Sequence, residues 1–291
     1  MGGWFSTSDP PSPPPRKVLD EPWRQINWGN TQDDLQYLNN YKPQRRDLQL
    51  RILLHGPVGA GKSSFINSVK SALQGKLCRQ VMVDNIGRGC FTKKYTTYKI
   101  EKGNRTIFYP FVLNDMMGLK HAGRRNRKIH VKDMKLVMKG KVKDDYTFNP
   151  ESKIPKNDPC YNNAPTDNDK VHIVVFVIDA NTAHLMDSDV VETLCDIRDE
   201  ATELGIPQVA LFTKIDEACR EIKTDMKNVY RSKSLQTKIE KFSANVGIPV
   251  NCIFPVKNYH SETNLNDDIN ALILNTLRNI ITIADDASNQ N

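Results

Sequence analysis

The stretch that decides the fold reads RILLHGPVGAGKSSFINSVKSAL and occupies residues 51–73. It contains a complete G-x-x-x-x-G-K-S motif from Gly56 to Ser63. The motif lies between an apolar run that predicts a strand over residues 48–54 and a periodic segment that predicts a helix over residues 62–73. Glycines in such a loop let backbone N–H groups curl around a phosphate, and the start of the helix adds the positive end of its dipole. The stretch therefore predicts a phosphate-binding loop.

The residues of this loop have distinct expected roles. Lys62 is positioned to reach the β- and γ-phosphates of a nucleotide, and the Ser63 hydroxyl is positioned to bind Mg²⁺. The other contacts come from the backbone, whose N–H groups point at phosphate oxygens. We therefore expect these loop residues to bind the nucleotide: Gly56, Val58, Gly59, Ala60, Gly61, Lys62, Ser63 and Ser64.

Strands and helices alternate along the rest of the chain. Apolar runs predict strands over residues 170–179, 208–213 and 250–256, and helical periodicity predicts helices over residues 187–204 and 265–283. Two further strands, over residues 95–100 and 106–113, are separated by Gly103 and Asn104 and form a predicted antiparallel hairpin. This order predicts an α/β fold of three layers, in which a mostly parallel sheet carries helices on both faces.

A second motif follows the predicted strand that ends near residue 113. The sequence FVLNDMMG, residues 111–118, ends in D-x-x-G. The Asp115 carboxylate is placed to hold the Mg²⁺ shell, and the Gly118 N–H is placed to sense a γ-phosphate. A threonine that would cap both Mg²⁺ and the γ-phosphate is best assigned to Thr92, just before the hairpin, although Thr96 and Thr97 within the strand remain alternatives.

The choice of base depends on two later strand ends. Residues 213–216 read TKID, which fits T-K-x-D with Thr213, Lys214 and Asp216 at the ligand side. A carboxylate at Asp216 can accept hydrogen bonds from both the N1–H and the N2 amine of guanine, a donor pair that adenine lacks, and the Lys214 stem can lie against the purine face. Residues 252–258, CIFPVKN, add Lys257 as a last base contact. Together these motifs predict a guanine nucleotide, GTP or GDP, with Mg²⁺.

The composition limits the classes of protein to which the chain can belong. The chain has 291 residues, of which 38% are hydrophobic and 26% charged, so a wholly disordered or collagen-like chain is excluded. We expect a disordered proline-rich tail over residues 1–21, one domain over residues 22–286 with a basic insertion at about 119–169, and a flexible end over residues 287–291. No apolar secretory segment follows the start Met, so the expected location is cytoplasmic. Six cysteines without a C-x-x-C pair predict reduced thiols.

Basic charge is concentrated in one segment. Ten Lys and Arg residues and one acid, Asp133, lie within residues 120–143, whereas the whole chain has a net charge of only +7. A solvated helix face, a docking surface for an acidic membrane or a protein partner, and an RNA contact are the alternatives. Aromatic residues are absent from the segment, which argues against nucleic acid as the partner.

The amino terminus carries a short modification signal. Residues 1–6, MGGWFS, fit M-G-x-x-x-[ST], the pattern for myristoylation at Gly2. The bulky Trp4 and Phe5 disfavour it, so an unmodified tail remains an alternative. A myristoyl chain together with the basic segment 120–143 would provide weak membrane contact.

The motifs in this order resemble the P-loop GTPase superfamily. The sequence in and around these motifs is similar to that of the interferon-induced protein 44 family in four stretches, namely residues 21–24 (EPWR), 53–69, 91–95 (FTKKY) and 146–150 (YTFNP). This resemblance implies a P-loop GTPase-like domain in a cytoplasmic, interferon-responsive GTP-binding protein of innate immune or antiviral defence.

Whether GTP is hydrolysed stays open at this point. Many GTPases place Gln directly after D-x-x-G to orient the attacking water, but this chain has Leu119. The chain thus resembles GTPases that depend on a partner or on self-association for turnover. Two interpretations remain, a GTP-dependent switch with slow hydrolysis and a nucleotide-stabilised scaffold without turnover. An ATP-using kinase would need a different base site, for which the sequence gives no signal.

Overall fold

The structure is a computed structural model that describes residues 18–29, 31–79, 94–119 and 124–289. Six strands in this part of the chain form one sheet in the order β2-β3-β1-β4-β5-β6. The strands are β1 (Leu50–His55), β2 (Thr96–Lys102), β3 (Asn104–Asp115), β4 (Ile173–Asp179), β5 (Gln208–Thr213) and β6 (Ile253–Pro255).

The sheet is parallel apart from one edge strand. β1 lies at its centre, where Leu53 stands opposite Asn114 of β3 and Val174 of β4. β5 and β6 continue the parallel order, and β2 pairs antiparallel with β3 as the predicted hairpin requires. Because parallel strands point the same way, the carboxyl ends of five strands meet at one edge of the sheet. Motifs placed after those ends are thereby collected into one region.

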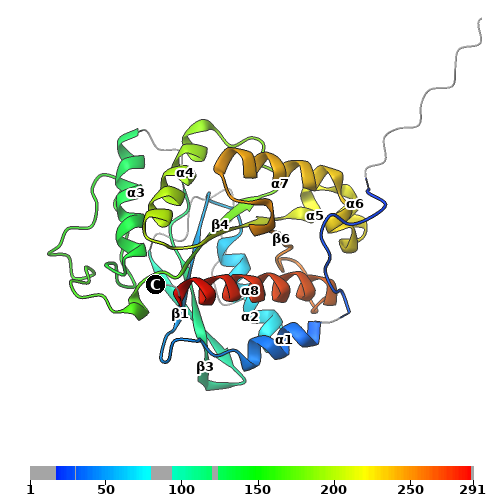
Figure 1. Ribbon diagram of the computed structural model, residues 1–291, viewed down its shortest axis with the longest axis horizontal. Coiled ribbons are helices and arrows are strands. Elements are labelled where there is room, and N and C mark those ends of the chain that lie inside the picture. The colour runs from blue at the N-terminus through cyan, green and yellow to red at the C-terminus, as the bar shows by residue number, and fades with distance from the viewer. Residues whose placement is uncertain (1–17, 30, 80–93, 120–123, 290–291) are drawn as a thin grey trace, which may run out of the picture.

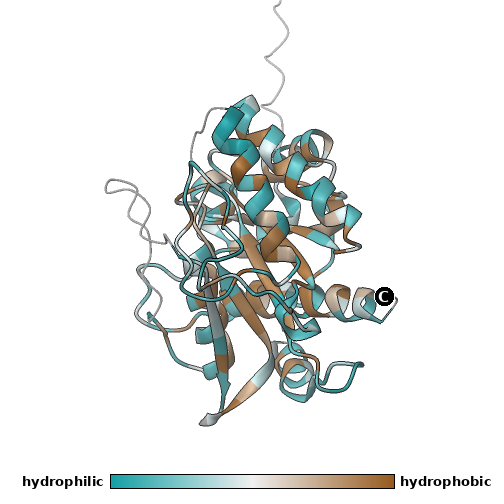
Figure 2. Cartoon of the chain, turned by 90° about the vertical axis from the view of Figure 1, so that its left-hand side faces the viewer, coloured by the Kyte–Doolittle hydropathy of each residue, from teal (hydrophilic) through white to brown (hydrophobic). Residues whose placement is uncertain are grey.

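Helices cover both faces of the sheet (Figure 1). α3 (Arg124–Met138), α4 (Ser188–Glu203) and α7 (Lys233–Val246) pack on one face, and α1 (Thr31–Asn40), α2 (Lys62–Gln74) and α8 (Asp267–Ser288) pack on the other. Side chains of β4 alternate between the two cores, with Phe176 toward the first face and Val177 toward the second. Figure 2 shows the apolar strands at the centre and polar residues on the outer helix faces. The predicted three-layer α/β class is confirmed.

Several short elements follow β5, and the sequence pattern did not indicate them. These are α5 (Ile215–Ala218), α6 (Arg220–Thr224), η2 (Met226–Arg231) and η3 (Val250–Cys252). The amino-terminal segment packs against them, since Trp23 N donates to Tyr230 O of η2 and the Arg24 guanidinium donates to Val250 O of η3. Val18 already pairs with Ser232, and α8 runs to Ser288, so the folded part extends beyond both ends of the expected 22–286 domain.

The expected insertion at 119–169 contains α3 and the short η1 (Asp167–Asp169). Much of its remainder is irregular backbone that buries large side chains in the core beneath α3 and α4, among them Tyr146, Phe148 and Ile154. Five of the six cysteines lie in the described residues, and these five are free thiols as expected. No helix within the described ranges combines the length and apolar character that a membrane span needs.

Candidate functional site

The phosphate-binding loop follows β1 at the carboxyl edge of the sheet. Its conformation requires glycine at two positions. Gly56 has a φ of +150°, and a Cβ atom there would lie 2.1 Å from Val177 O. Gly61 has a φ of +95° and directly precedes α2. A side chain at either position would force the loop away from the strand or out of the left-handed region, so the loop form is specified locally.

Two predicted Mg²⁺ ligands lie together behind this loop. Ser63 Oγ donates a hydrogen bond to Asp115 Oδ2 at 2.6 Å, and Asp115 Oδ1 accepts from Met116 N at 3.0 Å. Both side chains are buried. The pair joins the start of α2 to the end of β3, which neighbours β1 in the sheet. Thr92, the third predicted metal ligand, lies outside the described residues.

Lys62 lies over the loop itself. Its Nζ donates to Gly56 O at 3.1 Å and to Pro57 O at 3.0 Å. The ammonium group is therefore held directly above the backbone groups that would surround a phosphate.

The D-x-x-G segment is bound to the loop by backbone hydrogen bonds. Leu119 N donates to Gly56 O at 2.9 Å, and Val58 N donates to Leu119 O at 3.2 Å. A Cβ atom at Gly118 would lie 2.8 Å from Val58 Cα, so the close approach depends on glycine. The Leu119 side chain turns into the core beneath α3 and is 8% exposed.

The base side of the site is made by the residues after β5 and β6. Thr213 is fully buried below the loop, and its Oγ1 donates to Ala60 O at 2.6 Å. Lys214 has a φ of +54°, and its Nζ pairs with Asp179 Oδ2 at 2.8 Å. Thr213 thus supports the loop from beneath, while Lys214 bridges the ends of β4 and β5.

Asp216 is held by a cation from the next strand end. Lys257 Nζ lies 3.2 Å from Asp216 Oδ2 and 3.0 Å from Glu262 Oε1. Burial alone would lower the pKa of Lys257, but the two carboxylates raise it above its usual value. The three side chains are each between 21% and 24% exposed, so they remain accessible to a ligand.

A cavity of about 470 Å³ joins the loop to this base side. Such a volume is typical of a small-molecule site. Residues Gly59, Gly61, Lys62, Ser63, Ser64, Lys214, Asp216 and Lys257 of the predicted set line it. The others, Gly56, Val58, Ala60, Asp115, Gly118 and Thr213, do not line it.

Asn258 also lines the cavity, although the sequence analysis did not select it as a site residue. Its Nδ2 donates to Gly61 O at 3.1 Å, while its Oδ1 is buried and has no hydrogen-bond partner among the described residues. A buried carbonyl oxygen without a partner is costly, so this atom fits a site that receives a polar ligand. The sequence signal that could have identified Asn258 was its position directly after Lys257, in a loop at the end of a strand.

A second unpredicted feature lies behind the loop. His55 ends β1, and its Nε2 lies 3.0 Å from Nε2 of His130 on α3. Burial, then His130 and Lys62, hold the pKa of His55 well below its usual value. Burial and Lys62 lower the pKa of His130 to about 4. The two rings are therefore neutral at pH 7, and one N–H joins the phosphate-loop strand to α3.

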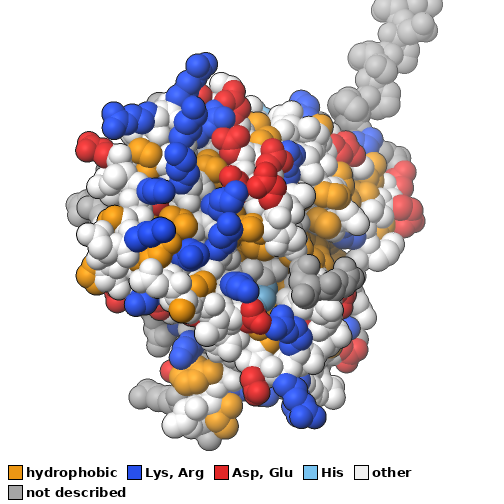
Figure 3. Space-filling model, turned by 60° about the vertical axis from the view of Figure 1, so that its left-hand side comes forward, with side chains coloured by type: hydrophobic (Ala, Val, Ile, Leu, Met, Phe, Trp, Pro, Cys, Tyr) orange, Lys and Arg blue, Asp and Glu red, His pale blue; other side chains and the backbone are white. Residues whose placement is uncertain are grey.

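The basic segment is partly neutralised by its neighbour helix. Arg127 pairs with Glu192 and with Asp196 of α4, the latter at 2.9 Å, and Lys135 pairs with Glu200 and Glu203. Figure 3 shows Lys and Arg side chains in a band across this face, with acidic side chains beside it. Membrane contact through this segment stays a prediction, and Gly2 lies outside the described residues.

Known proteins resemble this chain in sequence and in fold. No family model matches the chain. Interferon-induced protein 44 of Mus musculus is 36% identical over 258 residues, which cover 87% of this chain and 59% of that protein. Interferon-induced protein 44 of Homo sapiens is 35% identical over 253 residues, and the human interferon-induced protein 44-like is 33% identical over 251. The chain spans a little over half the length of these curated relatives.

A solved structure supports the fold. It carries the description "Dimerization is important for the GTPase activity of chloroplast translocon components atToc33 and psToc159". It aligns over 87% of this chain and 90% of its own, with a TM-score of 0.51 and 16% identity. The likeness shows a P-loop GTPase fold, and the identity of 33–36% across nearly nine-tenths of the chain makes it a member of the interferon-induced protein 44 family.

Proposed function

We propose that the protein binds GTP or GDP with Mg²⁺ in the cavity between the phosphate loop and the base side. The observation that carries the proposal is that one cavity joins a glycine-dependent phosphate loop to the Asp216 carboxylate. A cationic group at one end and a hydrogen-bond acceptor at the other match the two ends of a guanine nucleotide. The bound nucleotide makes the protein a switch in the interferon response.

At the phosphate end, Lys62 changes partners. Its Nζ leaves the carbonyl groups of Gly56 and Pro57 and donates to phosphate oxygens, which as anions accept stronger hydrogen bonds. Ser63 and Asp115 would hold Mg²⁺, which supplies charge neutralisation at the phosphates when bound. The hydrogen bond from Ser63 Oγ to Asp115 Oδ2 keeps both oxygens in place for this task.

At the base end, Asp216 reads guanine. Its carboxylate accepts hydrogen bonds from N1–H and from the N2 amine, and Lys257 yields part of its pairing with Asp216 while keeping Glu262 as a partner. Because the three side chains are partly exposed, giving up the Asp216–Lys257 contact costs about 1 kcal/mol at most. Two hydrogen bonds to a charged acceptor contribute about 3–6 kcal/mol in total. The net preference for guanine is therefore about 2–5 kcal/mol.

Hydrolysis is slow or depends on a partner. The side chain at the position after D-x-x-G belongs to Leu119, which is buried and offers no hydrogen bond to an attacking water. A catalytic polar group then has to come from another segment of this chain, from another protein or from a second copy of this chain. The alternative function, a scaffold that binds nucleotide without turnover, is favoured by the same observation.

The two interpretations have the same site and differ in one measurement. Nucleotide extracted from the purified protein identifies the ligand, and single-turnover hydrolysis of bound GTP, at several protein concentrations, separates switch from scaffold. A rate that rises with concentration supports turnover through self-association. Complete absence of hydrolysis at every concentration supports the scaffold.

Guanine selectivity is tested by three variants. Asp216→Ala should weaken GTP binding by about 30-fold or more, the lower end of the 2–5 kcal/mol above. Asp216→Asn should move the preference toward xanthine nucleotides, since its amide can donate to the O2 that replaces the guanine N2 amine. Glu240→Ala removes an exposed carboxylate of α7, outside the cavity, and serves as the control. Unchanged GTP affinity in Asp216→Ala, or equal binding of ATP and GTP by the natural protein, would contradict the proposal.

A further inference from the structure

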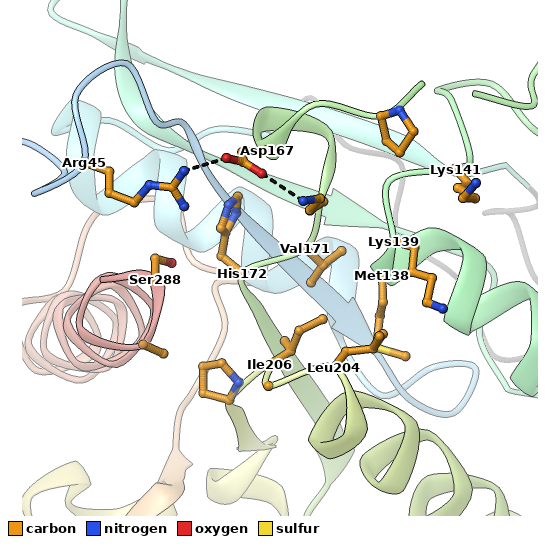
Figure 4. A pocket seen from close by; sticks show the side chains of 15 residues that line it. Arg45, Met138, Lys139, Lys141, Asp167, Val171, His172, Leu204, Ile206 and Ser288 are labelled. Carbon is orange, nitrogen blue, oxygen red and sulfur yellow. Dashed lines mark hydrogen bonds and ion pairs between the residues drawn. The ribbon is translucent and has the colours of Figure 1, made fainter. Parts of the chain in front are cut away.

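A second cavity, of about 590 Å³, lies at the opposite edge of the sheet (Figure 4). His172 and Pro207 line it, and these residues directly precede β4 and β5. The phosphate loop follows the carboxyl end of β1 instead. Since β4 has seven residues and a strand rises about 3.3 Å per residue, the two cavities are separated by roughly 20 Å. A ligand at this edge therefore does not share the nucleotide site.

The cavity has a cationic side. Arg45, Lys139, Lys141 and Lys170 line it together with a single carboxylate, Asp167. Asp167 is already held by Lys170 at 2.9 Å and by Arg45 at 2.5 Å, and these two cations lower its pKa to about 2. Lys139 and Lys141 make no ion pair with any residue in the described ranges, and the ammonium of Lys141 lies 5.7 Å from the centre of a tyrosine ring. The cavity therefore carries excess positive charge.

A neutral hydrogen-bond donor accompanies the cations. His172 Nδ1 accepts a hydrogen bond from Arg51 N at 2.9 Å, which places the proton of the neutral ring on Nε2. Burial, followed by Arg51 and Arg45, lowers the pKa of His172 to about 4, so the ring is neutral at pH 7. No described residue accepts the Nε2 hydrogen bond. Figure 4 shows His172 between Arg45 and Val171 at the cavity.

The opposite side of the cavity is apolar. Met138, Val171 and Ile206 are buried, and Leu204 is half-buried beside them. Figure 4 shows Leu204 and Ile206 below and the charged side chains of Arg45 and Asp167 above. Lys139 and Lys141 follow the carboxyl end of α3, where cations stabilise the helix dipole, which gives these two lysines one role already. That role does not explain the apolar wall.

We propose that this cavity binds an amphipathic anion, a single molecule with a phosphate or carboxylate head and an acyl body. The head accepts hydrogen bonds from Lys139 and Lys141, which Figure 4 shows on the same side of the cavity, and the body lies against Leu204 and Ile206. A free phosphate would leave the apolar wall unused, and a neutral apolar molecule would leave the cations unused. The volume lies in the range of small-molecule sites. This site is independent of the nucleotide proposal.

The test is calorimetric titration of the full chain with four probes below their micelle concentrations. Decyl phosphate and decanoate carry both features, decanol carries only the apolar body, and inorganic phosphate carries only the charge. We expect one molecule of decyl phosphate or decanoate to bind, at least about tenfold more tightly than decanol or inorganic phosphate. The stronger of the two anions identifies the head group. Equal binding of decanol, or of inorganic phosphate, would overturn the proposal.

Variants locate the binding. Lys139→Gln/Lys141→Gln should weaken decyl phosphate binding by about tenfold, whereas Lys128→Gln/Lys132→Gln removes the same charge from exposed positions on α3 outside the cavity and should leave it unchanged. Lys62→Ala should also leave it unchanged, because the phosphate loop is not involved. Loss of binding in Lys62→Ala, or equal loss in both double variants, would refute the cavity as the site.

Discussion

Replacing Gly118 by alanine tests how closely the D-x-x-G segment must approach the phosphate loop. The new Cβ would lie 2.8 Å from both Cα and Cγ2 of Val58 and 2.9 Å from Val58 N. Carbon atoms in contact are ordinarily about 3.5–4.0 Å apart, so the two segments must separate by roughly 0.7–1.2 Å. Two of the three atoms are backbone atoms, which no rotamer change can move aside.

This displacement lowers the free energy of unfolding. The hydrogen bonds from Leu119 N to Gly56 O and from Val58 N to Leu119 O, at 2.9 and 3.2 Å, would both lengthen beyond their useful range. Losing them costs about 1–2 kcal/mol, and overpacking adds about 1–3 kcal/mol. The alanine also restricts the unfolded chain, which stabilises the folded state by about 0.4–1 kcal/mol. The expected net loss is therefore about 2–4 kcal/mol.

Urea unfolding followed by tryptophan fluorescence measures this loss. Gly29→Ala is the control, because a Cβ atom there meets only Asn27 Oδ1, at an ordinary 3.8 Å. We expect the control to change stability by less than about 0.5 kcal/mol. If Gly118→Ala unfolds at the same urea concentration as Gly29→Ala, the close approach to Val58 is not required and the reasoning is wrong. Nucleotide affinity should fall in Gly118→Ala alone, since the loop is displaced.

Three further changes have expected outcomes of their own. Thr213→Val removes the hydroxyl that donates to Ala60 O at 2.6 Å and should lower the free energy of unfolding by about 1–2 kcal/mol, measured in urea. His130→Gln should flatten the pH dependence of stability between pH 6.5 and about 4. The folded pKa of His130 is about 4 and its ordinary pKa is 6.5, so the natural protein loses this contribution as the pH falls through that window. Arg127→Gln removes both ion pairs to α4 and should cost about 0.5–1 kcal/mol, a loss that shrinks at about 1 M salt.

Each of these changes has a control. Thr213→Ser keeps the hydroxyl and should restore most of the stability. His184→Gln alters an exposed histidine and should leave the pH profile unchanged. Burial raises the pKa of Asp133 to about 6, so its contribution is lost as the pH rises through that value; this opposite slope is common to both histidine variants and cancels in the comparison. Lys128→Gln removes an exposed charge of α3 at little cost. A result in which any control matches its test variant contradicts the corresponding reasoning.

The short-range features of this protein follow from its sequence. The loop from Gly56 to Ser63 depends on glycine spacing and on the helix start, both of which lie within a dozen residues. The alternation of strands and helices, and the hairpin around Gly103, follow from periodicity and turn chemistry in the same way. The parallel sheet then brings its carboxyl ends to one edge, so Ser63 and Asp115 could be expected at the same edge, whereas their direct contact depends on β3 lying beside β1. Element ends were less accurate, as at β6, where residues 250–252 form a short helix.

Contacts between side chains from different elements were decided by tertiary packing. Lys257 was predicted as a base contact, but its place between Asp216 and Glu262 depends on how the β6 loop folds back. The neutral pair of His55 and His130 depends on α3 lying over the end of β1.

The cavity of about 590 Å³, at the edge of the sheet where β4 and β5 begin, is the clearest case of a feature decided by tertiary packing. Its lining runs from Arg45 to Ser288 and comes from the ends of three helices and from loops before two strands. No periodicity links such positions, because each of them is an ordinary basic or apolar residue within its own segment. Only the order of the strands and the packing of helices on both faces bring these residues around one space.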